Sequence, residues 1–293
     1  MAFDGVFEAP KLVPAPCGLL SVANVTEHGA RANDETWVRG FSHKFHSYAT
    51  TRLLTENDDT VSGGTLFDAS GDPIYQDYSP FFIESEVSRS ALGVLGEDRF
   101  DEALKKLEAA TQKAVERELW AGSAALAASN SNNFLTKTGA STIPVAGAHS
   151  ASDALFHLEQ AIAESPTGTS GVIHMTRDVA SILGAKLVYI PGTESKPGRV
   201  MTRLGTDVVI GSGYTGAGPV GNANAAASLT NRWMFATGAL EVHLSKSEIV
   251  NENLAQGINA RINDMIIKGV RAAAVYFDPS IHFAMRVAVP ALA

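Results

Sequence analysis

The chain has 293 residues, 45% of them hydrophobic, which is enough to bury a large core in one or two domains. Its 31 acidic residues outnumber its 23 basic ones, and the net charge of −8 argues against tight direct binding of DNA. The single cysteine, Cys17, cannot form an internal disulfide. No signal peptide or apolar run of membrane-spanning length is present, so we expect a soluble intracellular protein without a membrane partner.

Residues 1–35 are predicted to form an extended arm. Pro10, Pro14 and Pro16 lie close together, and no hydrophobic period follows them. Such a segment buries little of itself. It is therefore either disordered or ordered by packing on something else.

Residues 36–80 are predicted to form an extended hairpin loop. Its first part is rich in aromatic and β-branched residues, as in strands, and three turn signals follow at Asn57–Asp59, Gly63–Gly64 and Gly71–Pro73. A polar hairpin of this length has no core of its own. It is either a floppy loop or a segment that lies on a neighbour. A strand with one buried side should follow, because the residues on one face are Phe81, Ile83, Ser85 and Val87.

Residues 97–121 carry the longest helical pattern of the chain. The acid-first pair Glu102 and Lys106 supports an exposed face. We expect the apolar side to pack on strands before Gly93 and after Arg271, and the charged side to face the surface or another subunit. The apolar side is formed by Phe100, Leu104, Leu107, Ala110, Ala114 and Leu119.

Residues 121–150 are small and polar, as in a boundary, and residues 151–267 read as a compact α+β domain. The helix at its start has an apolar stripe of Leu155, Leu158 and Ile162. The other expected elements are a strand at 171–175, a helix from Thr176 to Leu183-Gly184, and strands at Thr206–Ile210 and Trp233–Leu244.

The C-terminal part has an apolar strand, a break at Asp278-Pro279 and a final alternating strand. This final strand, residues 281–289, has no partner nearby in the sequence. We therefore expect it to pair with strands that precede residue 97, so that the middle block is inserted into a domain built from both ends of the chain.

The strongest chemical motif is Gly211–Gly216, a literal G-x-G-x-x-G after the strand at Thr206–Ile210. A dinucleotide-binding turn must open a helix whose N-terminus receives the pyrophosphate. Gly218 and Pro219 follow instead, and they are poor helix formers. The motif therefore favours a flexible glycine loop, with cofactor binding as the alternative.

Other reactive residues lack a site around them. His43 and His46 are three apart on a predicted strand and point to opposite faces. Cys17 lies in the proline-rich arm without a base, and Glu84 and Glu86 alternate on an open strand face. The sequence thus assigns no catalytic, cofactor-binding or metal-ligating residue, and we expect no enzyme.

The order of these parts resembles the major capsid protein of tailed double-stranded DNA phages, which has the Hong Kong 97-like fold. SPFFIESEVSRSAL resembles the approach to the spine helix of that family, and GVIHMTRDVASIL its apolar strand and short helix. LGTDVVIGSGYTGAG is similar to its axial strand and variable loop. The stretch that resembles its closing strands is RAAAVYFDPSIHFAMRVAVP. These four stretches are residues 79–92, 171–183, 204–218 and 271–290.

The resemblance implies an α+β subunit with an arm, an extended hairpin and two domains. The implied parts are an N-terminal arm at 1–35, an extended hairpin loop at 36–80, a peripheral domain at 81–135 and 268–293 with spine helix 97–121, and an inserted axial domain at 136–267.

The function that the resemblance implies is self-assembly into an icosahedral capsid, as pentamers and hexamers that enclose double-stranded DNA. Localisation in the virion, assembly in the host bacterial cytoplasm, and portal, scaffold and decoration proteins as partners are implied with it. No lysine lies between Lys44 and Lys105, so a hairpin cross-link is not expected, and neither is a cleaved scaffold segment. An encapsulin-like compartment and a small-molecule enzyme that uses the Gly211–Gly216 loop are the alternatives.

Overall fold

The computed structural model describes residues 15–29, 36–44, 75–90, 98–130, 132–143, 147–165, 170–192, 198–250, 258–259 and 264–290. Its helices are η1 Leu19–Ser21, α1 Thr36–Arg39, α2 Asp98–Ala121, α3 Ser123–Ala128, α4 Ala151–Ala163, α5 Arg177–Leu183 and η3 Gly184–Lys186. Its strands are β1 Asn24–Glu27, β2 Phe41–Lys44, β3 Tyr75–Tyr78, β4 Phe81–Ser90, β5 Ser141–Thr142, β6 Val172–Thr176, β7 Leu187–Ile190, β8 Arg199–Thr202, β9 Asp207–Gly211, β10 Asn231–Thr237, β11 Leu240–Leu244, β12 Glu248–Ile249, β13 Ile258–Asn259, β14 Asp264–Phe277 and β15 His282–Ala288.

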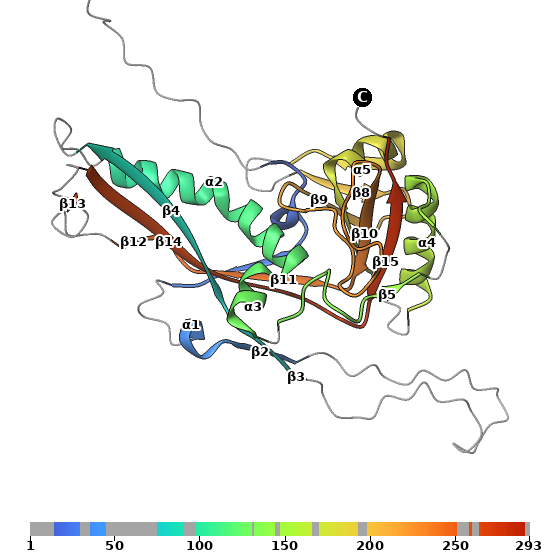
Figure 1. The fold of residues 1–293 in the computed structure, drawn as a ribbon, viewed down its shortest axis with the longest axis horizontal. Coiled ribbons are helices and arrows are strands. Elements are labelled where there is room, and N and C mark those ends of the chain that lie inside the picture. The colour runs from blue at the N-terminus through green and yellow to red at the C-terminus, as the bar shows by residue number, and fades with distance from the viewer. Residues whose placement is uncertain are drawn as a thin grey trace, which may run out of the picture.

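The described strands form two large sheets and a separate pair, β2 with β3 (Figure 1). In the six-stranded sheet the order is β1-β11-β14-β12, and β4 and β13 also pair with β14. In the seven-stranded sheet the order is β5-β15-β10-β6-β9-β8-β7. Helix α2 packs on β4 and β14 of the first sheet, and α4 packs on β15 and β10 of the second. The predicted α+β class is confirmed.

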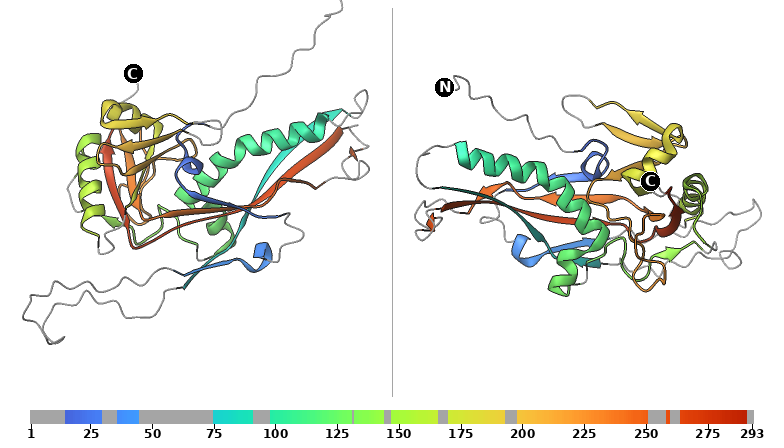
Figure 2. Two further views of the ribbon diagram at one scale, coloured as in Figure 1. Left: turned by 180° about the vertical axis from the view of Figure 1, so that it is seen from behind. Right: turned by 45° about the horizontal axis from the view of Figure 1, so that its top comes forward.

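The two sheets are joined by one bent antiparallel ribbon. Strand β10 pairs with β15 in the seven-stranded sheet, and the continuations of these strands, β11 and β14, pair in the six-stranded sheet. Figure 2 shows β14 and β15 meeting at a sharp bend. At this bend the Gly238 amide lies 3.3 Å from the Asp278 carbonyl oxygen, and the Asp278 amide donates to Ala239 at 3.0 Å. Both sides of the ribbon therefore pass from one sheet to the other at this bend.

This ribbon corrects the predicted pairing of the final strand. The strand that pairs with β4 is β14, which precedes the Asp278-Pro279 break, whereas the final strand β15 pairs with β10. The single strand predicted at Trp233–Leu244 is divided into β10 and β11, which lie in different sheets. Strand pairing therefore crosses the predicted limits of the segment 136–267. Strand β11 lies within this segment but pairs with β14 outside it, and β15 lies outside the segment but pairs with β10 within it.

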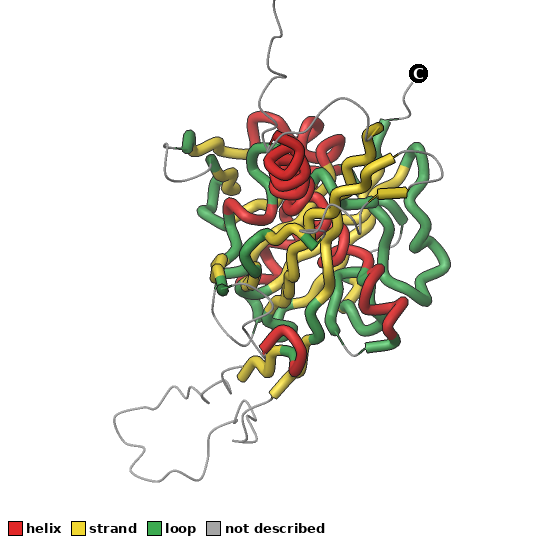
Figure 3. Tube along the Cα trace, turned by 90° about the vertical axis from the view of Figure 1, so that its left-hand side faces the viewer, coloured by secondary structure: helices red, strands yellow, loops and turns green. Residues whose placement is uncertain are grey.

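Helix α2 confirms the predicted helix at 97–121, but its buried side differs from the predicted stripe. Leu107 and Leu119 are buried as expected, whereas Ala110 is exposed. The second half of α2 buries polar side chains as well as apolar ones, among them Glu116 and Glu118. The buried side changes because α2 passes from the six-stranded sheet toward the second sheet. Figure 3 views the helix nearly end-on, with strands beneath it.

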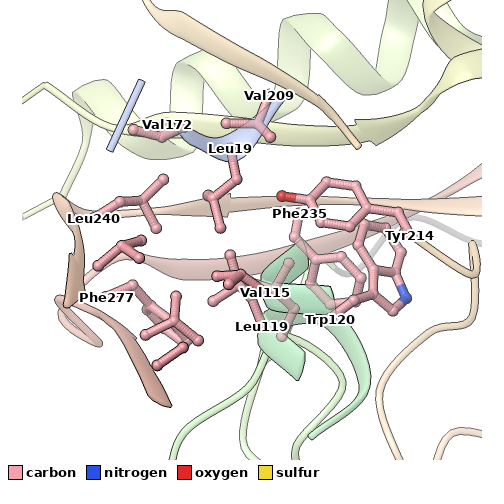
Figure 4. Close-up of a cluster of buried hydrophobic side chains, with 14 of the residues drawn as sticks. Leu19, Val115, Leu119, Trp120, Val172, Val209, Tyr214, Phe235, Leu240 and Phe277 are labelled. Atoms are coloured by element: carbon pink, nitrogen blue, oxygen red, sulfur yellow. The ribbon is translucent and has the colours of Figure 1, made fainter. Parts of the chain in front are cut away.

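One hydrophobic core extends from α2 into both sheets. Leu119 and Trp120 of α2 lie in the same cluster as Phe235 of β10 and Phe277 of β14 (Figure 4). A second core lies between the seven-stranded sheet and the helices α4 and α5, and it includes the predicted stripe of α4. The first core therefore belongs to both sheets, whereas the second belongs to the seven-stranded sheet and its helices.

The region after α2 also differs from the predicted boundary, because α3 follows α2 directly. Gly122 separates the two helices with a φ of 57°, and a Cβ at this position would lie 2.2 Å from the Phe134 ring. The Glu118 carboxylate accepts hydrogen bonds from the amides of Ala124 and Ala125 at 2.7 and 2.9 Å. This carboxylate therefore satisfies amides of the first turn of α3 that have no partner within the helix.

The arm and hairpin are described in part. Strands β2 and β3 pair at the base of the predicted hairpin, and the predicted excursion at residues 45–74 lies outside the described residues. Residues 36–39, predicted as strand, form α1 instead, with Trp37 buried. Strand β4 confirms the predicted one-sided burial, with Phe81, Ile83 and Val87 buried.

We predict that the bend tolerates no side chain at Gly238. In Gly238→Ala the added Cβ would lie 2.8 Å from Cβ of Asp278, so the substitution should lower the free energy of unfolding by about 1–3 kcal/mol. Urea denaturation of unassembled subunits measures this loss. The control is Gly29→Ala, where the added Cβ has no neighbour within 4 Å and the change should stay within about 0.5 kcal/mol. Equal effects of the two substitutions would contradict the close approach at the bend.

Candidate functional site

Glu116 of α2 is the polar centre of the junction between the two sheets. Its side chain is fully buried. One carboxylate oxygen accepts from the Leu19 amide at 3.1 Å, and the other accepts from the amides of Ser212 and Gly213 at 2.7 and 2.8 Å. The Ser212 hydroxyl donates to the second oxygen at 3.0 Å. One side chain thus joins three segments that are about a hundred residues apart in sequence.

The Gly211–Gly216 loop is held against α2 by these hydrogen bonds. Gly213 approaches the helix so closely that a Cβ there would lie 2.3 Å from the Lys113 carbonyl oxygen. No helix follows the loop, since residues 212–219 are described without one. The two amides that could meet a pyrophosphate donate to Glu116 instead. The motif is therefore not a dinucleotide-binding turn, and the predicted glycine loop is hydrogen-bonded to α2.

The described part of the arm, residues 15–29, packs on its own subunit. The Cys17 carbonyl accepts from the Ile210 amide of β9 at 2.9 Å, and the Gln112 side chain of α2 donates to the Ala15 carbonyl at 2.8 Å. Leu19 is fully buried, and β1 pairs in parallel with β11. This segment therefore contacts β9, α2 and β11, and so links both sheets.

A buried chain of hydrogen bonds runs from the glycine loop to the bend. His174 of β6 lies with Nδ1 2.8 Å from the Tyr214 hydroxyl and Nε2 2.9 Å from Oγ1 of Thr237. Thr237 donates its hydroxyl proton to the Gly238 carbonyl at 3.0 Å. Its oxygen must then accept from Nε2–H, which leaves Nδ1 to accept from Tyr214. His174 is therefore a neutral core histidine with both ring nitrogens satisfied.

Burial governs the titration of this chain. Removal from water lowers the pKa of His174 to about 3, and His282 contributes to the shift. Burial also raises the pKa of Tyr214 well above its usual value, with a further contribution from Glu116. At neutral pH both groups are therefore uncharged hydrogen-bonding partners.

The other residues considered for chemistry are not brought together. Burial raises the pKa of the Cys17 thiol, and Arg177 lowers it less. Glu84 and Glu86 are exposed on β4 and pair with Lys268 of β14 at 2.6 and 3.8 Å. His43 lies on β2, and His46 lies outside the described residues. Among the described residues, no three His, Cys, Asp or Glu side chains form a group that could hold a metal ion.

The helices of the described ranges include none with both the length and the apolarity needed to cross a membrane.

Sequence reasoning missed Glu116, although a signal was present. Glu116 lies next to Val115 and three residues before Leu119, both of which face the core. This spacing places the carboxylate at the margin of the buried side. No sequence pattern identifies its partners, because Leu19 and the glycine loop reach it only through the fold.

Comparisons with known proteins identify the fold. A scan against protein-family models finds no match, and a search of curated proteins finds no similar sequence. The structure is similar to the capsid of an empty GTA particle, with 11% identity and a TM-score of 0.56, over 99% of this chain and 94% of the other. It is also similar to a chain from Mycobacterium phage Cain, with 11% identity and a TM-score of 0.51, over 98% and 94%. A chain from Gordonia phage Cozz aligns with 12% identity and a TM-score of 0.50, over 99% and 92%.

These similarities cover nearly the whole of each chain, so they concern the complete arrangement of elements and not one shared motif. The chain has the fold of capsid subunits. More particularly, the predicted Hong Kong 97-like fold of phage major capsid proteins is confirmed.

We predict that Glu116 stabilises the subunit through its buried amide partners. In Glu116→Gln the side-chain NH₂ group would oppose N–H donors, so the free energy of unfolding should fall by about 1–3 kcal/mol. Chemical denaturation of unassembled subunits measures the change. Glu108→Gln on the exposed side of α2 is the matched control and should have little effect. A Glu116→Gln variant as stable as this control would disprove the role of the carboxylate.

We also predict that His174 makes stability fall with acidification. The unfolded chain binds a proton at His174 near pH 6.5, whereas the folded chain resists protonation down to a pKa of about 3. Stability therefore decreases as the pH falls below about 6.5, by up to about 1.4 kcal/mol per pH unit from this group. Denaturation at pH 7, 6 and 5 should give a shallower pH dependence for His174→Gln than for the parent. Identical slopes would show that His174 does not contribute.

Proposed function

We propose that this protein is a structural subunit that self-assembles into the icosahedral capsid of a tailed bacteriophage. The observation that carries the proposal is the similarity of the whole chain to the capsid of a GTA particle. The shell would be built from pentamers and hexamers of this chain and would enclose double-stranded DNA without sequence-specific binding. It would reside in the virion after assembly in the host bacterial cytoplasm, with portal, scaffold and decoration proteins as further partners.

The architecture supports this role because the two sheets are joined by a continuous ribbon of strands and a common core. A shell of many copies needs subunits of constant shape, since small changes in angle accumulate around a closed surface. The bent ribbon, the common core and Glu116 all fix the angle between the sheets. In this proposal the six-stranded sheet with α2 is the peripheral part of the subunit, and the seven-stranded sheet is the axial part.

Shell contents distinguish this proposal from an encapsulin-like compartment, because one fold serves several functions. Nuclease-resistant DNA inside particles from infected cells supports the phage capsid. Small particles of one size that contain an enzyme instead support the compartment.

We predict that the purified protein assembles into closed particles. Velocity sedimentation should give a fast component that increases with protein concentration, and negative-stain microscopy should show hollow shells. The control is Glu116→Ala, which leaves buried amides without an acceptor and should reduce the yield of regular shells. A parent protein that stays monomeric at every concentration, with and without the other capsid proteins of its phage, would overturn the proposal.

A further inference from the structure

The seven-stranded sheet has two different ends. At one end, β7 is the last strand of the sheet, and its outer edge is unpaired within the described residues. Val188, Tyr189 and Ile190 are 45%, 56% and 36% exposed. An exposed apolar edge strand is a template for pairing with another chain unless something covers it. Within the described part of this subunit, nothing does.

The β7 end is also basic. Lys186, Arg199 and Arg203 are exposed there, beside Leu204, which is 81% exposed. Residues 184–192 and 198–206 contain no Asp or Glu. Two carboxylates from neighbouring residues reach this end: Asp207 lies 3.7 Å from Arg199, and Glu159 of α4 accepts a hydrogen bond from the Thr206 hydroxyl at 2.6 Å. Positive charge and apolar surface therefore occur together at this end.

The opposite end carries a groove between α4 and β5. Its volume is about 260 Å³. Its walls are Ser141, Thr142, Ile143, His157, Gln160, Ala161, Glu164 and Phe283. In Figure 1, α4 and β5 lie beside β15, and β9 lies on the other side of β10. The groove is thus separated from β7 by the width of the sheet.

The groove end is acidic. Asp153 of α4 and Glu164, the residue that follows α4, are exposed, as is Phe156 at 64%; of these three, Glu164 lines the groove. Residues 150–165 contain no Lys or Arg. This end therefore complements the β7 end, because a basic apolar edge matches an acidic margin with an apolar groove.

We propose that the β7 end of one copy docks in the α4–β5 groove of the next copy of this chain. Two different, complementary surfaces at opposite ends of one sheet produce a head-to-tail contact, which closes into a ring when the rotation is right. Tyr189 enters the groove, and Lys186 and Arg203 face Glu164. The contact rests on the proposed shell function, since it is the contact that holds copies together in a ring.

Charge reversal tests the contact. The β7-end variant is Lys186→Glu with Arg203→Glu, and the groove variant is Gln160→Lys with Glu164→Lys. Each variant places like charges opposite each other, so the fraction of protein in fast-sedimenting particles should fall about tenfold or more. The chain that carries all four substitutions restores opposite charges and should regain assembly. Circular dichroism of the unassembled subunits checks that every variant is folded.

An apolar substitution tests the same contact independently. Tyr189→Ser should reduce assembly, whereas Leu126→Ser, on α3 and 61% exposed, should leave it near the parent level. Normal assembly of the β7-end and groove variants would overturn the contact while leaving the shell function intact. Failure of the fourfold variant to regain assembly would also overturn it, because the restored opposite charges would then not face each other. Failure of the parent to form shells would refute the proposed function instead.

Discussion

The buried carboxylate of Glu116 is the interaction on which the rest of the structure depends. Moving a charged group out of water is costly, and only well-formed hydrogen bonds offset that cost. Glu116 has four such bonds, three from backbone amides and one from a hydroxyl. Because these donors belong to the arm and to the glycine loop, neither segment can leave α2 without exposing an unpaired buried group. The carboxylate therefore fixes the position of α2 relative to both sheets.

Around this point the two sheets share a ribbon of strands and a hydrophobic core. The ribbon of β10–β11 and β14–β15 passes through both sheets, and the core beneath α2 contains side chains from each. A relative rotation of the sheets would break backbone hydrogen bonds at the bend and open the core. Packed cores resist small deformations, so the subunit keeps one shape.

The described part of the arm, residues 15–29, is ordered by packing on another surface, which is one of the two predicted alternatives. Its proline-rich composition indicates a segment that needs another surface for order, and residues 15–29 do have one. That surface is their own subunit, where Leu19 is buried and β1 joins β11. In the proposed shell, other surfaces remain for contacts between subunits. The uncovered β7 edge and the groove beside α4 are features of this kind, and they lie at the periphery of the folded unit, away from Glu116.

The sequence by itself determined the elements whose pattern is local: the long helix, the one-sided strand β4, the stripe of α4 and the turn into α5. Periods of 3.6 and 2 residues report which side of an element is buried, and they need no knowledge of its partners. The order of these elements was enough to indicate the capsid fold. Only the tertiary structure decided that β15 pairs with β10 and that Trp233–Leu244 is divided between two sheets. It also decided that Glu116 accepts hydrogen bonds from the glycine loop. These features depend on partners about fifty to a hundred residues away, and local periodicity carries no information about partners so distant in sequence.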